Sequence, residues 1–142
     1  MFIVFDANGV HVGDAAQTQY GISMRYEPTK DSYLKLRGTY FDDHYSNFDP
    51  LTLNGDNARR ESWKTPAYKL VDLHGGYDFK VFNNKKLEIK FSVLNALNEI
   101  YISDAQNNAK YNYDDIQDFD AKSASVFFGL GRRFNLSSTF IF

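Results

Sequence analysis

Residues 131–142 read GRRFNLSSTFIF, and the alternation within this stretch indicates the fold class. Counting back from the last residue, every second position is mostly apolar, whereas most of the positions between them are polar. The first set consists of Phe142, Phe140, Ser138, Leu136 and Phe134. Because successive side chains of a β-strand point to opposite faces, the stretch predicts a strand with one apolar and one polar face.

The same period of two recurs earlier in the chain, and helical periodicity is almost absent. Connections between the alternating stretches are in turn short, long, short and long, with the two long ones at 42–65 and at about 99–122. This rhythm is typical of strands that run up and down. The sequence therefore predicts an all-β fold, an antiparallel up-and-down meander of about five strands. The expected strands cover residues 16–26, 33–41, 69–81, 87–93 and about 123–142.

The composition excludes several classes of function. The 142 residues include no cysteine, which rules out disulfides, thiolate metal sites and cysteine nucleophiles. A formal net charge of −2 gives no support for nucleic-acid binding. Aromatic residues make up 17% of the chain, yet the mean hydropathy is only −0.48. Low hydropathy does not argue against a membrane location here, because transmembrane β-strands alternate and give a weak hydropathy signal.

The length of the last strand fits a membrane. Ten steps separate Phe142 from Arg132, which is about 33 Å along a strand. Tilted by about 40°, such a strand rises about 25 Å, the height of the apolar band of a membrane barrel. Arg132 has the same parity as the apolar residues, and we expect it at the outer headgroup level, where a guanidinium can reach lipid phosphates.

The end of the chain resembles the C-terminal assembly signal of bacterial outer-membrane β-barrels. The residues that carry this resemblance are Phe134, Leu136, Phe140 and Phe142. In that family the barrel-assembly machinery captures the last strand by its edge. Physically this is β-augmentation, in which the main chain supplies affinity and alternate side chains supply specificity.

The stretch from residue 68 to 101 narrows the resemblance to TonB-dependent outer-membrane receptors. Such receptors often show Tyr-x-x-x-Asp, an aromatic pair before a short turn, then Val-x-Asn-Leu-Phe-Asn and a tyrosine. Ala96 and Leu97 stand where Leu-Phe is usual, a mild departure. The matching positions are Tyr68, Asp72, Tyr77, Phe79, Val93, Asn95, Leu97, Asn98 and Tyr101.

The resemblance implies a nutrient importer of the outer membrane of a Gram-negative bacterium. A complete receptor of this family is a 22-stranded barrel that is plugged by an N-terminal domain. It takes up iron–siderophore complexes, cobalamin or glycans. The implied partners are outer-membrane lipid, the barrel-assembly machinery, the remaining strands and the plug, with TonB reached only through the N-terminal part. No cofactor and no enzymatic activity are implied.

About five strands cannot close a barrel, and open sheet edges are not tolerated in lipid. We therefore expect residues 1–14 to end a preceding extracellular loop and residues 15–142 to form the closing strands of a larger barrel. The sequence shows no plug domain and no signal peptide, so we expect a C-terminal fragment that does not transport alone. The alternative is a soluble β-sheet module that binds a ligand and whose apolar faces meet in one core.

Two groups of acidic residues in the sequence contain possible metal ligands. Asp114, Asp115, Asp118 and Asp120 offer oxygen ligands, but their spacing lacks the glycine and the closing glutamate of a calcium-binding EF-hand loop. Asp42, Asp43, His44 and Asp49 lack a second nearby histidine. Both groups are interpreted as solvated loops.

The remaining candidates concern ligand contact and catalysis. Tyr101, Tyr111 and Tyr113 can either stack on a ligand or pack their loop on itself, and the sequence leaves both open. Asp72 and His74 share a strand face but have no nucleophile beside them, so we interpret them as polar wall residues. A barrel enzyme is accordingly the least favoured function.

Overall fold

The computed structural model describes residues 4–82, 85–107 and 120–142. Two 3₁₀ turns, η1 (Pro50–Thr52) and η2 (Gly55–Asn57), lie between the second and third strands. In the described part of the chain no helix has the length and apolarity needed to cross a membrane. The strands are β1 (Thr18–Thr29), β2 (Ser32–Asp42), β3 (Tyr68–Lys80), β4 (Lys86–Leu94), β5 (Ile102–Asn107), β6 (Ala124–Phe128) and β7 (Arg133–Ile141).

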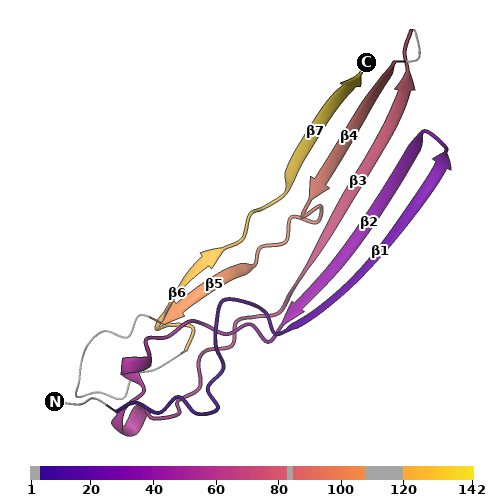
Figure 1. Ribbon diagram of the computed structural model, residues 1–142. Helices are drawn as coiled ribbons and strands as arrows, with labels where there is room; N and C mark the ends of the chain where they lie inside the picture. Colours follow the sequence, from indigo (N-terminus) through magenta and orange to yellow (C-terminus); the bar gives the residue numbers. More distant parts are fainter. Residues whose placement is uncertain (1–3, 83–84, 108–119) are drawn as a thin grey trace. The chain divides into compact units, whose positions relative to one another are not determined.

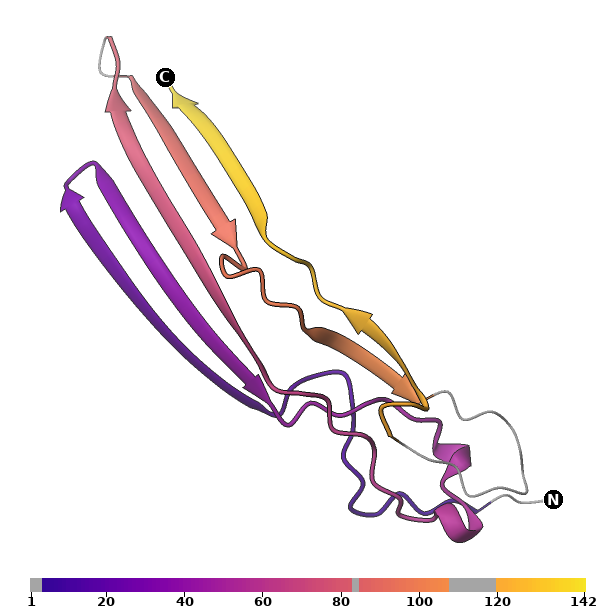
Figure 2. The same ribbon diagram turned by 180° about the vertical axis from the view of Figure 1, so that it is seen from behind.

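Five of these strands form one antiparallel sheet in the order β1-β2-β3-β4-β7 (Figures 1 and 2). The predicted all-β class and the meander of five strands are therefore confirmed. Strands that are neighbours in this sheet are also consecutive in the chain, apart from the β5–β6 hairpin that comes between β4 and β7. The β1–β2 turn, the end of β3, the start of β4 and the end of β7 lie at one end of the sheet (Figure 1).

The register of β3, β4 and β7 sorts their side chains into two unlike sets. Leu87 lies between Phe79 and Phe140, and Phe91 lies between Gly75 and Leu136. Directly paired residues of antiparallel strands project to the same face. We call this face the apolar face; in these three strands it consists of Leu73, Gly75, Tyr77, Phe79, Leu87, Ile89, Phe91, Val93, Phe134, Leu136, Ser138 and Phe140.

Contacts extend the apolar face onto β1 and β2. A Cβ added to Gly38 would lie 3.6 Å from Ile22 Cγ2, which places β1 and β2 side chains on a common face. Leu34 of β2 lines a shallow hollow together with Tyr77 and Phe79 of β3. By alternation, these two strands add Tyr20, Ile22, Met24, Tyr26, Leu34, Leu36, Gly38 and Tyr40 to the apolar face.

The opposite face, called the polar face, is lined by charged and hydroxyl side chains. Glu88 lies between Asp78 and Thr139, and Lys90 lies between Gly76 and Ser137. On the neighbouring strands, the guanidinium carbon of Arg25 lies 4.1 Å from the centre of the Tyr33 ring. The sheet thus separates apolar from charged side chains over its whole width.

The chain divides into two compact units. The sheet unit holds residues 20–40, 68–100 and 130–142, and the loop unit holds residues 1–19, 41–67 and 101–129. The segments of the loop unit precede β1, join β2 to β3 and join β4 to β7. In an up-and-down sheet these attachment points all lie at the same strand ends, opposite the short turns.

The last part of the chain differs from the prediction of one strand over 123–142. It forms two strands, β6 and β7, with the break at residues 129–132, and β6 pairs with β5. β5 itself lies in the stretch predicted as a polar loop. A Cβ on Gly129 would come within 1.9 Å of the Tyr101 ring, so the ring lies against the glycine backbone where the strand breaks. Gly129 directly follows β6, where the strand breaks.

Gly75 and Gly76 let large side chains cross β3 on both faces. A Cβ on Gly75 would lie 2.3 Å from Phe91 Cε1 on the apolar face. A Cβ on Gly76 would lie 2.5 Å from Tyr33 Cε1 on the polar face. Both distances are far below van der Waals contact, so each ring occupies the space that a side chain would need.

Replacing Gly75 tests this packing. We expect Gly75→Ala to lower the free energy of unfolding by roughly 1–3 kcal/mol, the usual effect of overpacking, because Phe91 must leave its position. The matched control is Gly21→Ala, whose Cβ would meet only Gly38 O at 4.0 Å. The measurement is denaturant unfolding of the purified protein. Equal stability of the two variants would contradict the close packing of Phe91 on Gly75.

Candidate functional site

The apolar face of the sheet is exposed to solvent over its whole width. Ile22 on β1 is 78% exposed, and Phe134 and Leu136 on β7 are 72% and 79% exposed. Among the described residues the buried apolar side chains are Ala16, Leu53 and Ala105, all of which belong to the loop unit. Soluble monomers rarely expose contiguous apolar patches larger than a few hundred Å². The face is therefore the strongest candidate for a functional surface.

The residues predicted to carry the assembly signal lie on this face at the edge of the sheet. Phe134, Leu136 and Phe140 belong to β7, every residue of which is exposed, and the Phe142 side chain follows it at 93% exposure. The rings of Phe140 and Phe142 meet edge to face, with centroids 5.0 Å apart. Arg132 precedes β7, and its backbone N–H donates to Asn98 Oδ1.

The polar face carries a chain of ion pairs. Lys86 Nζ lies 2.7 Å from Asp78 Oδ2 and 2.9 Å from Glu88 Oε1, and Lys90 Nζ lies 2.9 Å from the other Glu88 oxygen. A hollow of about 340 Å³ at this place is lined by Arg25, Glu27 and Tyr33 together with Asp78, Glu88 and Lys90. A surface with this many charged side chains favours contact with water.

Asp72 and His74 do not form an acid–base pair. His74 Nδ1 lies 2.9 Å from Ser92 Oγ, which is its direct cross-strand neighbour. Asp72 Oδ1 instead accepts a hydrogen bond from the backbone N–H of Asn95. Both side chains therefore make contacts within the sheet unit.

A corner built by Asn95 and Asn98 follows β4. Both residues have left-handed backbones, with φ of 49° and 55°, a conformation that asparagine tolerates better than most residues. Asn95 is buried; its Nδ2 donates to Glu99 O (2.9 Å) and Leu130 O (3.2 Å), and its Oδ1 accepts from Glu99 N (2.8 Å). The corner thereby ties the chain leaving β4 to the chain entering β7.

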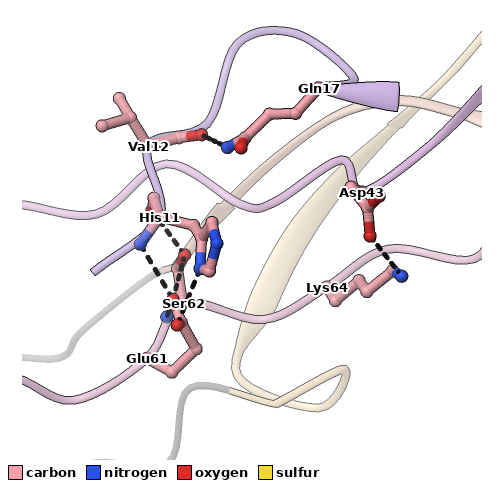
Figure 3. Close-up of polar contacts among 7 residues, drawn as sticks. All are labelled: His11, Val12, Gln17, Asp43, Glu61, Ser62 and Lys64. Carbon is pink, nitrogen blue, oxygen red and sulfur yellow. Dashed lines mark hydrogen bonds and ion pairs between the residues drawn. The ribbon is translucent and has the colours of Figure 1, made fainter. Parts of the chain in front are cut away.

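In the loop unit, both the ring and the backbone of His11 contact the Glu61 carboxylate (Figure 3). Its Nδ1 lies 2.8 Å from Glu61 Oε2, and its backbone N–H donates to Glu61 Oε1 at 3.0 Å. The imidazole stacks on Tyr45 with centroids 4.3 Å apart. Ser62 Oγ donates to the carbonyl of His11 rather than to its ring, so these residues do not form a catalytic triad.

These contacts shift the pKa of Glu61. Partial burial alone would raise it, but the hydrogen bonds from the amide and ring of His11 and from the amide of Ser62 outweigh burial and hold the pKa below its ordinary value. Nearby, Lys64 Nζ lies 2.7 Å from Asp43 Oδ1 and 2.9 Å from Asp42 Oδ1. Hydrogen bonds from Lys64 and from the Thr18 hydroxyl lower the pKa of Asp43, and the two carboxylates raise that of Lys64.

The acidic group at residues 42–49 is therefore divided among separate contacts. Asp42 and Asp43 bind Lys64, and Asp49 Oδ1 accepts from Leu51 N at the start of η1. His44 is buried, and neither of its ring nitrogens has a hydrogen-bond partner. Among residues 4–82, 85–107 and 120–142, no three His, Cys, Asp or Glu side chains come together as a metal site.

The other predicted loop residues are only partly described. Tyr101 packs on Gly129, a contact within the loop unit itself. Asp120 accepts hydrogen bonds from the amides of Lys122 and Ser123, and the bond from Ser123 in particular lowers its pKa. Tyr111, Tyr113, Asp114, Asp115 and Asp118 lie outside the described residues.

Comparisons with protein-family models, curated proteins and solved structures gave no match to this chain. Its function is therefore argued from the two faces of the sheet and from the loop unit.

The Asn95 corner is open to a direct test. We expect Asn95→Ala to lower the free energy of unfolding by roughly 3 kcal/mol, because it removes three hydrogen bonds of a buried side chain and places alanine in a left-handed conformation. Asn95→Gly removes the same side chain without the backbone penalty, so it is expected to cost about 1 kcal/mol less. Denaturant unfolding measures both. Equal losses in the two variants would show that the backbone conformation contributes nothing.

A second test concerns the pH dependence that Glu61 confers. Because its pKa is lowered in the folded state, Glu61 contributes stability above its unfolded pKa of about 4.3, and this contribution disappears as the pH falls through the folded value. The wild type should thus be more stable than Glu61→Gln near neutral pH and should lose this advantage in acid. Thermal melts that follow Trp63, the single tryptophan, report on the loop unit.

The control for this experiment is Asp56→Asn, which removes a negative charge from the same unit without touching the contacts of His11. A difference between wild type and Glu61→Gln that stays constant down to acid pH would contradict the assignment.

Proposed function

We propose that this chain is the closing part of the β-barrel of a TonB-dependent outer-membrane receptor that imports a scarce nutrient of the iron–siderophore, cobalamin or glycan class. In this proposal the apolar face contacts lipid and the polar face lines the lumen. The loop unit belongs to the extracellular end. The 22-stranded barrel, the plug and the link to TonB follow from the sequence resemblance alone.

The observation that carries the proposal is the exposed apolar face. Five neighbouring strands present aromatic and aliphatic side chains to one side and ion pairs to the other, with no described residue covering the apolar side. A soluble module needs that face to meet a core, and the described residues of the sheet unit provide none. Alternation of apolar-out and polar-in is the pattern of strands in membrane barrels.

The height of the apolar face supports a membrane setting. The pairing of β4 with β7 runs from Lys86–Ile141 to Leu94–Arg133. This span is about 27 Å long at roughly 3.4 Å per residue. With the tilt of about 40° that is usual in barrels, the strands rise roughly 20 Å, close to an apolar band of about 25 Å.

The edges of the sheet support a larger barrel. β1 and β7 are the two outer strands, and neither has a further neighbour in the described chain. In lipid an open edge leaves backbone N–H and C=O groups without partners, at a cost of several kcal/mol each. In the proposed barrel both edges pair with further strands of the same receptor, and capture of β7 during assembly by the barrel-assembly machinery uses the same main-chain groups.

Within such a receptor this chain forms part of the barrel wall and some of its loops, and it has no catalytic role. Its ion pairs on the polar face keep a water-filled lumen hydrated, and the Asn95 corner passes the chain from a wall strand into a long loop. No step of catalysis is assigned to it. The proposed ligand class rests on the family resemblance. The same holds for any contact of a ligand with Tyr101, Tyr111 and Tyr113.

A pair of single-cysteine variants tests the proposal, and the absence of native cysteine in this chain makes the labelling specific. Leu136→Cys lies on the apolar face and Ser137→Cys, its neighbour, on the polar face. Each is labelled with a bimane fluorophore in outer membranes from cells that make the intact protein. We expect a lipid-soluble quencher to act on the label at 136, and a water-soluble quencher to act on the label at 137.

Fractionation of the same cells provides the control, because the protein should sediment with the outer membrane and require detergent for extraction. A soluble protein whose two labels both respond only to the water-soluble quencher would overturn the membrane proposal. It would favour a soluble β-sheet module that binds a ligand.

A further inference from the structure

Lys85 lies on the apolar face, at the short-turn end of the sheet. The backbone N–H of Val81 donates to Lys85 O at 2.8 Å, which continues the β3–β4 pairing two positions beyond Phe79–Leu87. Lys85 therefore has the parity of Leu87 and not that of Lys86. At this end of the face its charge follows the apolar side chains of Phe79, Leu87 and Phe140.

Lys85 comes directly before β4, and its side chain lies beside the aromatic rings at the end of the chain. Its Nζ lies 5.5 Å from the ring centre of Phe142 and 6.0 Å from that of Phe140. These distances are within the range of cation–π contact. The ammonium group is thus held beside two aromatic rings, the outer of which is the most exposed large apolar side chain of the sheet unit.

No carboxylate neutralises Lys85 in the described part of the chain. The nearby carboxylates of Asp78 and Glu88 are engaged by Lys86 and Lys90. A hollow of about 310 Å³ lined by Lys85 and Val81 also includes Asp31, Asp78, Lys80 and Lys86, of which Asp78 and Lys86 belong to the polar face. Lys85 thus lies at the border of the two faces, with its ammonium group on the side of the aromatic rings.

We propose that Lys85 binds the phosphate of an anionic glycerophospholipid, such as phosphatidylglycerol, in the leaflet on the short-turn side. The proposal rests on the membrane location proposed above. An ammonium group beside two exposed rings complements a lipid, whose phosphate meets the cation while its acyl chain follows Phe140 and Leu87. A soluble anion would gain nothing from the apolar surface that surrounds this charge.

The test measures lipid retained by the intact protein. Wild type and variants are purified from outer membranes and reconstituted in nanodiscs that contain phosphatidylcholine and phosphatidylglycerol, and bound lipids are counted by native mass spectrometry. We expect Lys85→Ala to weaken retention of phosphatidylglycerol roughly fivefold, the effect of one basic residue at an anionic lipid surface. Lys85→Arg should retain the lipid.

Lys35→Ala is the matched control, since it removes a lysine from the polar face of β2 and should leave retention unchanged. Unchanged phosphatidylglycerol retention in Lys85→Ala, or equal retention of phosphatidylcholine by the wild type, would overturn the lipid site. Displacement of the lipid by inorganic phosphate would also overturn it, in favour of a site for soluble anions.

The two proposals fail in different ways. If the protein is soluble and neither label responds to the lipid-soluble quencher, the membrane location itself is wrong. If the label at Leu136→Cys is quenched from the lipid but the Lys85 variants behave as wild type, only the headgroup site is wrong.

Discussion

The pairing of β4 with β7 is the constraint on which the two-faced sheet depends. It places Phe134, Leu136 and Phe140 beside Val93, Phe91 and Leu87, and it places Asn135 and Thr139 beside Ser92 and Glu88. A slip of one residue would move every aromatic ring of β7 onto the charged face. Because β7 lies at the edge, only β4 and the Asn95 corner hold this register in the described chain.

Three kinds of contact cooperate to fix that register. The Gly75–Gly76 pair gives Phe91 and Tyr33 room on opposite faces of β3. Ion pairs around Glu88 join neighbouring positions of the polar face, where they are exposed and individually weak. The corner adds hydrogen bonds between buried groups, which cost much more to break. Shape and buried polar contacts, rather than a hydrophobic core, therefore specify the sheet.

The sequence predicted the sheet well because a period of two is a direct consequence of strand geometry. All five strands of the sheet and the sorting of their side chains follow from that pattern. The β5–β6 hairpin was not predicted because its first strand is largely polar from Ser103 to Asn107 and does not alternate, so β6 had no recognisable partner. The contact between His11 and Glu61 joins residues fifty positions apart, so no local sequence pattern predicts it. Asn95 and Asn98 appeared in the family motif, but their left-handed backbones were visible only in the structure.

The Asn95 corner also affects how freely the connection between β4 and β7 can vary in sequence and length. Asn95 Nδ2 donates to Leu130 O, and Asn98 Oδ1 accepts from the backbone N–H of Arg132. These bonds join the segment that follows β4 to the segment that precedes β7. Closing a longer loop costs little additional entropy once its ends are held. Insertions or exchanges between these two segments thus leave β4 and β7 in register. The length and sequence of the connection are therefore free to diverge while the pairing of the two strands stays the same.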